Sequence, residues 1–400
     1  MHVFIITQYY PPEIGASASR WSDYTQILLK QNHKVTVLCE APHYPHKKYY
    51  PGYKNKWCYI EKRSTRFTIV RSKAFSSDRK SFFKKISHYL VFMLSAIVNS
   101  KKIKDFDLLI ISSPPLFTGI IGLHLKYFRG KKYWLDVRDL WPDSALELNQ
   151  INNGFFYKIG KKMESRIYKS AEGFIFPVPS FKKYLKNFSK EVSKKPMIEL
   201  VNGVSSSFLK NSKSQKISTQ DKFIVLYSGN MGLAQDLKTI IKAAKFLKSY
   251  NIYFKFIGDG VCKSEIEILA KPFNKKIEFC EPMPRDELIK HILKSSVCLV
   301  PLKDKKIFNS ALPSKMFEYM ACGKPIIASV RGDAKKVIND SGSGIAVHPE
   351  NAKLLSNAIL TYFNDSKRCK VDGKNGMTFV TSNLSKEVLI SSMLNKIKSE

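Results

Sequence analysis

Short apolar runs alternate with amphipathic stretches along the first half of the chain. Residues 3–7 and 34–39 are apolar runs of strand length, and the stretch 18–31 between them has the apolar spacing of a helix. This order predicts a β-α-β unit of the doubly wound kind. Further apolar runs predict more strands at 108–112, 133–137, 173–177 and 200–204, the last with a turn at Asn-Gly.

The same alternation starts again at residue 223. A strand is predicted at 223–227, a helix at 236–249 and a strand at 253–257. The stretch 205–221 is rich in Ser and Lys without apolar period, so we interpret it as a linker. The repeated pattern predicts an α/β protein of two doubly wound, Rossmann-like domains that face each other, 1–204 and 222–383, with a final helix over 384–400.

Residues 309–329 are the most informative stretch. They predict a short helix that starts near Pro313 or Ser314, stops at Gly323 and buries Met316, Phe317, Tyr319 and Met320. A buried parallel strand is expected over 325–329. A loop that leads into a helix N-terminus presents free N–H groups and a partial positive charge, which suit a phosphate group.

The sequence Leu-Pro-Ser-Lys-Met-Phe-Glu-Tyr at 312–319 resembles the nucleotide-sugar loop of GT-B glycosyltransferases of family 4. It is most similar to a bacterial subgroup that adds amino sugars such as N-acetylfucosamine to surface polysaccharides. Two glutamates that flank seven residues mark this loop in the family. Glu318 matches the second, which implies contact with the ribose hydroxyls, whereas Ser310 replaces the first, which faces the donor sugar. The donor loop implied by the resemblance comprises Ser310, Leu312, Pro313, Ser314, Lys315 and Glu318; the alternative is an ordinary buried helix with a solvated glutamate.

Two segments of the first half carry further candidates. The segment Pro-Pro-Glu-Ile-Gly-Ala at 11–16 resembles the first loop of the same subgroup. Gly15 in this segment would let a phosphate or sugar approach the backbone. The alternative is that the segment forms only a tight turn. The predicted strand 133–137 ends in Arg138-Asp139, where family members often have His-Asp. Arg138 is suited to a diphosphate or carboxylate, or to an ion pair with Asp139 or Asp143. Glu13 and Asp139 are candidates for acceptor activation.

The second half has another turn suited to phosphate at Gly229-Asn230-Met-Gly232, between a predicted strand and helix. Family members often hold the diphosphate there with an arginine and a lysine, but this chain has Asn230 and Gln235 or Asp236 instead. The positive charge would then come from Lys315 or Lys263, and Lys263 is equally explained as a solvated helix lysine. By resemblance, the backbone near Met283 recognises the base.

Composition adds an unusual charge. The hydrophobic fraction of 44% and the charged fraction of 25% indicate a folded protein, and the formal charge of +34 calls for an anionic partner or surface. Residues 54–104 hold 14 basic and 2 acidic residues. The apolar run 89–98 is too short to span a bilayer, so it predicts an interfacial or a core helix. We expect membrane contact at Arg79, Lys80, Lys84 and Lys85; a generally lysine-rich proteome is the alternative explanation.

Other protein classes receive less support. The fingerprint G-x-G-x-x-G is absent, which disfavours a dinucleotide oxidoreductase. The seven cysteines form no C-x-x-C pair and have no histidine at metal spacing, so they are expected to be reduced thiols, and neither a metal nor another cofactor is expected. The N-terminus is predicted to be a first strand and not a signal peptide. We therefore expect a cytoplasmic protein, peripheral on the inner face of the cell membrane.

The resemblance implies a retaining glycosyltransferase. It would move an N-acetylated deoxysugar from a UDP-sugar to a polyprenyl-diphosphate-linked glycan in capsule, O-antigen or exopolysaccharide synthesis. The second domain would bind the donor across a cleft from the first, which would bind the acceptor and receive the last helix. The alternatives are an epimerase or phosphorylase on the same fold and a basic nucleic-acid-binding protein. The last has no helix-turn-helix, zinc or RNA-recognition signature, and no nucleic acid is expected as a partner.

Overall fold

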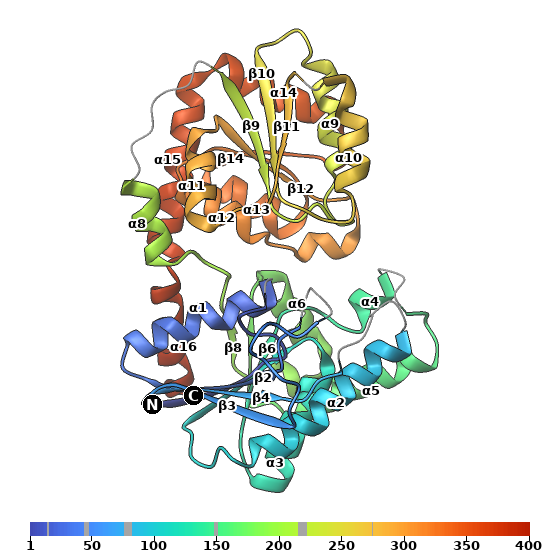
Figure 1. The fold of residues 1–400 in the computed structure, drawn as a ribbon, viewed down its shortest axis with the longest axis vertical. Coiled ribbons are helices and arrows are strands. Elements are labelled where there is room, and N and C mark those ends of the chain that lie inside the picture. Colours follow the sequence, from blue (N-terminus) through green and yellow to red (C-terminus); the bar gives the residue numbers. More distant parts are fainter. Residues whose placement is uncertain (14–15, 44–47, 76–81, 148–150, 215–221, 274) are drawn as a thin grey trace. The chain divides into compact units, whose positions relative to one another are not determined.

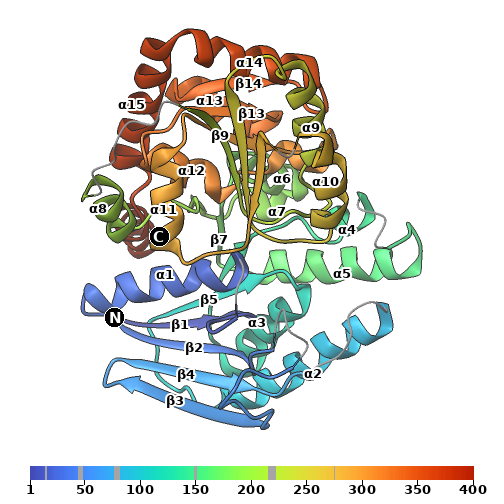
Figure 2. The same ribbon diagram turned by 45° about the horizontal axis from the view of Figure 1, so that its top comes forward.

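The computed structural model describes the whole chain except residues 14–15, 44–47, 76–81, 148–150, 215–221 and 274. The chain forms two compact units, shown in Figures 1 and 2. Unit 1 contains Met1–Val201 and Ile390–Glu400, and unit 2 contains Asn202–Leu389.

Unit 1 is built on an eight-stranded sheet in the order β3-β4-β2-β1-β5-β6-β7-β8. All neighbouring strands are parallel except β3 and β4, which form an antiparallel pair at one edge. The central strands are almost entirely buried, as expected for a sheet covered on both faces. The strands are β1 (His2–Ile6), β2 (Lys34–Glu40), β3 (Cys58–Ser64), β4 (Phe67–Ser72), β5 (Leu108–Ser113), β6 (Trp134–Val137), β7 (Gly173–Phe176) and β8 (Met197–Glu199).

Helices cover both faces of this sheet. Figure 1 shows α1 on one face, and α2 and α3 on the other. The last helix begins in unit 2 and continues into unit 1, where the Ser391 hydroxyl accepts a hydrogen bond of 2.8 Å from the Gln31 amide. The helices are α1 (Ala16–Lys30), α2 (Phe82–Ser100), α3 (Leu116–Arg129), α4 (Asp143–Glu147), α5 (Phe155–Ser170), α6 (Pro179–Phe188), α7 (Lys190–Ser193) and α16 (Lys386–Ser399).

Unit 2 has a six-stranded parallel sheet in the order β11-β10-β9-β12-β13-β14. Its strands are β9 (Phe223–Ser228), β10 (Ile252–Ile257), β11 (Ile277–Cys280), β12 (Val297–Pro301), β13 (Ile326–Ser329) and β14 (Gly344–Val347). Its helices are α8 (Ser206–Ser214), α9 (Leu237–Phe246), α10 (Lys263–Ala270), α11 (Arg285–Lys294), α12 (Ser314–Ala321), α13 (Gly332–Ser341), α14 (Ala352–Asn364) and α15 (Ser366–Asn383), with 3-10 turns η1 (Lys271–Phe273) and η2 (Lys306–Ser310).

The core of unit 2 follows from the apolar pattern. Side chains of β9, β10, β12 and β13 pack against α9 and α14, and the buried set includes Val225, Ile240, Phe254 and Ile359. The helix predicted before Gly323 is confirmed as α12, and its four predicted core residues are buried. Since every strand of this sheet is parallel, all strand ends that carry the candidate residues lie at one edge.

Two predictions from the sequence are wrong. The strand predicted at 200–204 lies earlier, as β8, and the Asn-Gly turn follows it; Val204 makes only an isolated bridge with Ser385. The stretch 205–221, predicted as a linker, contains α8. Within α8, Phe208 and Leu209 are buried, and α8 packs against α11 and α12, so two apolar residues were enough to anchor a helix in a Ser/Lys-rich stretch.

Helix α2 confirms the core alternative for the apolar run 89–98, whereas contact with a membrane stays a prediction. Phe92, Met93 and Ala96 are buried in the core, whereas Leu90, Leu94 and Val98 are exposed along a stripe with a spacing of four residues. Among the described residues, none of the helices combines the length and the apolar content needed to cross a bilayer.

Candidate functional site

The candidate donor site lies at the carboxyl edge of the sheet in unit 2. The turn 229–232 follows β9, the loop 258–262 follows β10, and α12 begins beyond the loop after β12. The Tyr319 hydroxyl of α12 accepts a hydrogen bond of 2.9 Å from the Ser228 N–H at the end of β9. This contact ties the second half of α12 to the end of β9, next to the turn 229–232.

Lys315 joins α12 to that turn. Its ammonium group lies 4.1 Å from the ring centre of Tyr227 and donates a hydrogen bond of 3.0 Å to the Tyr227 hydroxyl. A Cβ atom built on Gly229, where φ is +122°, would lie 2.8 Å from Lys315 Nζ. The backbone conformation therefore favours glycine at this position, and a side chain there would displace the end of Lys315.

Burial lowers the pKa of Lys315 to about 7, and the nearby carboxylate of Glu318 only partly opposes this effect. An amine in an apolar setting favours its neutral form, because the charged form loses hydration. An anion bound at the turn would favour the charged form. The structure thus places a buried, titratable lysine beside a helix N-terminus.

Glu318 lies on the exposed side of α12 and is partly buried. Its Oε1 accepts a charge-assisted bond of 2.5 Å from Arg285, the first residue of α11. The guanidinium group of Arg285 also packs over the ring of Phe208, 5.0 Å from its centre. The carboxylate is thus held in one direction by a planar, donor-rich partner.

The rest of the predicted donor loop surrounds the start of α12. Ser310 ends the turn η2, Pro313 is the N-cap of α12, and Ser314 is its first residue. Leu312 lies between them and is partly buried. The backbone N–H groups of the first turn of α12 therefore follow directly on this loop.

The other predicted donor contacts are placed as follows. Asn230 is exposed in the turn after β9, and the buried Gly232 donates its N–H to the Gln235 side chain at 3.1 Å. Met283 is partly buried between β11 and α11. Lys263 forms an ion pair with Glu281, which raises its pKa. Lys315, and not Lys263, is the lysine that lies against the turn.

Unit 1 contains a cavity of about 160 Å³. Tyr89, Phe117 and Trp141 supply aromatic walls, and Lys85, Asp139 and Ser144 supply polar groups. Asp139 Oδ2 accepts a hydrogen bond of 2.9 Å from Ser144, and burial raises the pKa of this carboxyl group. An aromatic cavity with a single carboxyl group is suited to a ligand with apolar faces and a hydroxyl group.

Arg138 and Glu13 are built into the scaffold beside this region. Arg138 donates a bond of 2.7 Å to the carbonyl oxygen of Pro114, and burial lowers its pKa. Glu13 is 3% exposed and accepts bonds from the N–H groups of Tyr10 and His43 at 3.3 and 3.2 Å. Their catalytic roles stay predictions. Lys84 is exposed on α2, whereas Gly15, Arg79 and Lys80 lie outside the described residues.

Comparison with known proteins gives the family of this site. Residues 209–378, which include every element of the candidate donor site, match the family model described as glycosyl transferases group 1. Across 371 residues the chain is 23% identical to the colanic acid biosynthesis glycosyl transferase WcaI of Escherichia coli K12, covering 89% of this chain and 90% of WcaI.

Solved structures agree on the fold over the whole chain. Sucrose-phosphate synthase from Thermosynechococcus elongatus is similar with a TM-score of 0.75 at 17% identity, covering 100% of this chain and 98% of that one. HepE of Anabaena, in complex with UDP-glucose, is similar with a TM-score of 0.69 at 11% identity, covering 100% of both chains. The chain is a GT-B glycosyltransferase.

Sequence reasoning missed two polar contacts of this glycosyltransferase. The partner of Glu318, Arg285, received no role from the sequence. Its signal was a Pro-Arg pair at a helix start after a strand. In unit 1, Asp136 at 0% exposure pairs with Arg20 at 2.8 Å and also accepts bonds from Trp21 and Ser112. A charged residue in an otherwise apolar strand was the available signal for this network.

Proposed function

We propose that this glycosyltransferase transfers a sugar from a UDP-sugar to a lipid-linked glycan in the synthesis of a surface polysaccharide. The observation that carries the proposal is the convergence of the Gly229 turn, the N-terminus of α12, Lys315 and Glu318 at one sheet edge. HepE, which shares the fold, is in complex with UDP-glucose, and the name of WcaI refers to colanic acid. Both support the donor class and the polysaccharide.

Each group has a defined part in donor binding. The diphosphate lies against the backbone N–H groups at the start of α12, where Lys315 neutralises the charge that develops on the leaving group. Glu318 accepts hydrogen bonds from the ribose hydroxyls while Arg285 holds its other side. The family resemblance implies retention at the anomeric carbon and an N-acetylated deoxysugar as the transferred group.

The cavity of unit 1 is the proposed site for the acceptor. Sugar rings have apolar faces that pack on aromatic side chains such as Tyr89 and Trp141. Asp139, whose pKa burial raises, would accept a hydrogen bond from the attacking hydroxyl group. In this proposal unit 1 binds the acceptor and unit 2 binds the donor.

Glu318 gives the direct test of donor binding. Glu318→Ala should weaken the binding of UDP-sugar measured by calorimetry by about 10- to 100-fold, because hydrogen bonds to a charged group contribute roughly 1.5–3 kcal/mol each. Glu287→Ala, at an exposed position of α11, is the matched control and should bind normally. Equal affinity of the Glu318 variant and the wild type would remove the assignment.

A panel of nucleotide sugars, scored by thermal stabilisation, identifies the sugar. Product analysis with donor alone and with donor plus lipid-linked acceptor then separates transfer from epimerisation. Formation of product without acceptor would contradict the proposed reaction. Tight, salt-dependent binding to duplex DNA without affinity for any nucleotide sugar would contradict it as well.

Membrane contact is proposed for the exposed side of α2. Its stripe of Leu90, Leu94 and Val98 lies between the exposed lysines Lys84 and Lys101, an arrangement suited to an anionic lipid surface. Leu94→Glu should lower binding to anionic vesicles about tenfold or more, since burial of a leucine contributes roughly 1.5–3 kcal/mol. The control Val371→Glu, equally exposed on α15, should sediment with vesicles like the wild type. Unchanged binding of the Leu94 variant would refute this contact.

A further inference from the structure

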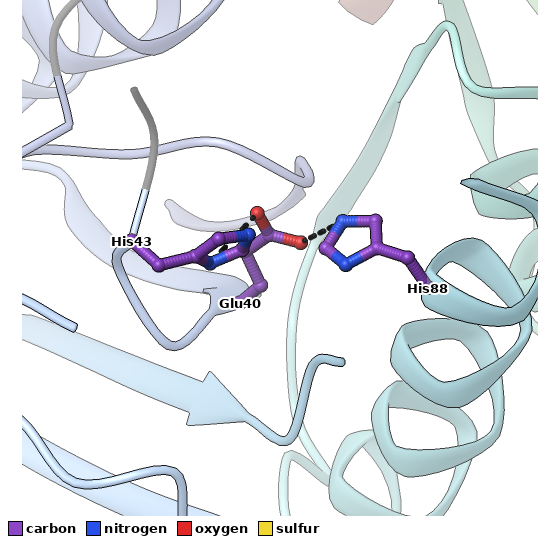
Figure 3. Close-up of side chains that lie close together, drawn as sticks. All are labelled: Glu40, His43 and His88. Atoms are coloured by element: carbon purple, nitrogen blue, oxygen red, sulfur yellow. Dashed lines mark ion pairs between the residues drawn. The ribbon is translucent and has the colours of Figure 1, made fainter. Parts of the chain in front are cut away.

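Three side chains that commonly ligate metals meet inside unit 1, apart from the residues assigned above to donor and acceptor. Glu40 ends β2, His43 follows in the next loop, and His88 lies on α2. Figure 3 shows the Glu40 carboxylate between the two imidazole rings. The three residues are at most 2% exposed. One possible ligand atom from each lies within 4.8 Å of the other two.

The separations between these atoms suit one small ion. Glu40 Oε2 lies 3.1 Å from His88 Nε2, and Glu40 Oε1 lies 3.6 Å from His43 Nδ1. Ligands at about 2.0–2.2 Å from a tetrahedral Zn²⁺ are roughly 3.3 Å apart. The two imidazole nitrogens, which lie within 4.8 Å of each other, must move closer together to reach this geometry.

Backbone contacts orient the His88 ring. His88 Nδ1 lies 2.7 Å from the carbonyl oxygen of Phe75, and donation there leaves Nε2 as the acceptor that faces Glu40. A metal-bound histidine usually donates its second ring N–H in this way. His43 Nδ1 lies 3.0 Å from the carbonyl oxygen of Ala41, so a metal at this nitrogen replaces that hydrogen bond and requires the neutral tautomer with its proton on Nε2.

Gln8 supplies a fourth group. Its amide nitrogen lies 2.6 Å from His88 Nε2 and 2.7 Å from Glu40 Oε2, and the residue is fully buried. Its Oε1 accepts no hydrogen bond from any residue that the structure describes. Rotation of the amide by half a turn exchanges the two atoms and directs Oε1 at the same point as the other ligands.

We propose that Gln8, Glu40, His43 and His88 bind a structural divalent transition metal, with Zn²⁺ as the preferred ion. Two imidazoles with a carboxylate suit zinc better than calcium or magnesium, which take mainly oxygen ligands. Four protein ligands in a buried place are typical of a structural site and leave no position for a substrate. The ion would tie the end of β2 and its following loop to α2, whose exposed face is the proposed membrane contact.

The test uses the full-length chain without a tag, freed of metal with a chelator and titrated with Zn²⁺ or Co²⁺. We expect one Zn²⁺ per chain by calorimetry and by mass spectrometry, a raised Tm, and Co²⁺ absorption bands of tetrahedral coordination. His88→Gln and Glu40→Gln should each lower the affinity for Zn²⁺ at least about 100-fold. His124→Gln on α3 is the control and should bind like the wild type.

The measurement of Zn²⁺ binding by the wild-type protein tests the proposal even if a variant does not fold. Absence of stoichiometric Zn²⁺ binding by the wild type would overturn it, and the cluster would then be a hydrogen-bonded core network. Zn²⁺ binding that persists in folded His88 and Glu40 variants would overturn it too.

Discussion

Removal of the Lys315 charge is the sharpest test of how the donor diphosphate is held. Lys315→Met keeps the apolar stem over the Tyr227 ring but deletes the ammonium group that lies against the turn at Gly229. A hydrogen bond to a charged partner contributes about 1.5–3 kcal/mol. The variant should therefore bind UDP-sugar about 10- to 150-fold more weakly at pH 6.

The pH dependence distinguishes this lysine from an ordinary surface charge. Burial lowers the pKa of Lys315 to about 7 in the free protein, and a bound diphosphate raises it, so the donor binds with uptake of a proton. Affinity is then complete below pH 7 and is lost as the pH rises through 7. Between pH 6 and pH 8 the wild type should lose about tenfold in affinity, whereas Lys315→Met should show a flat profile.

Calorimetry in two buffers of different ionisation enthalpy measures both quantities, the affinity and the protons taken up. A UDP-sugar is the right ligand, because its diphosphate is a diester and does not titrate in this range. Lys290→Met, at an exposed position of α11, is the control and should keep the wild-type profile. A wild-type affinity that does not change between pH 6 and pH 8, or a Lys315 variant that keeps the wild-type slope, would refute the reasoning.

Three further predictions concern Gly229, Lys315 and the buried ion pair of Asp136 with Arg20. Gly229→Ala should lower both Tm and donor affinity, because its Cβ would lie 2.8 Å from Lys315 Nζ at a φ of +122°; Gly130→Ala, at a φ of +61° with open space around it, should lower only Tm. The free energy of unfolding, measured with urea, should rise between pH 7 and about pH 10 in the wild type but less in Lys315→Met. In this range the folded protein has lost the Lys315 proton, whereas the unfolded chain keeps it, so a rise in pH favours the folded state. Asp136→Asn should lower the free energy of unfolding by about 3–5 kcal/mol, since it leaves the buried Arg20 without its counter-charge; an unchanged urea midpoint would contradict this.

The elements predicted with success are those whose signal is contained in a short window. The predicted strands β1, β2, β5, β6, β7, β9, β10 and β13 are apolar runs of parallel sheets, and α12 has a proline at its start and Gly323, with a φ of +65°, just after its end. The pair β3 and β4 was not predicted. Its outer strand, β3, exposes Tyr59 and Ile60 and continues with three consecutive charged residues at 61–63, so it lacks the long apolar run that marks the other strands.

The candidate site was only partly predictable for a different reason. Lys315 and Glu318 were found because they lie within one motif, whereas Arg285 comes from another helix 33 residues away and meets Glu318 only in the folded chain. The cluster of Glu40, His43 and His88 escaped because α2 brings His88 across 45 residues of sequence. Spacing rules for metal sites detect ligands that are close together in the sequence. In this cluster Glu40 and His43 are close in the sequence, but His88 lies on a distant helix.

The contact between Lys315 and Gly229 would let this chain bind a diphosphate without a cation in the turn after β9. At that turn the chain has Asn230, and no side chain at Gly229 stands between the backbone and α12. The ammonium group of Lys315 reaches the turn from the first turn of α12, where the helix dipole disfavours its charge as well as burial does. Its positive charge is therefore at full strength only when an anion lies beside it. A lysine placed in this way would hold the proposed diphosphate strongly and would be partly neutral after its release, so that loss of the diphosphate would be coupled to loss of a proton.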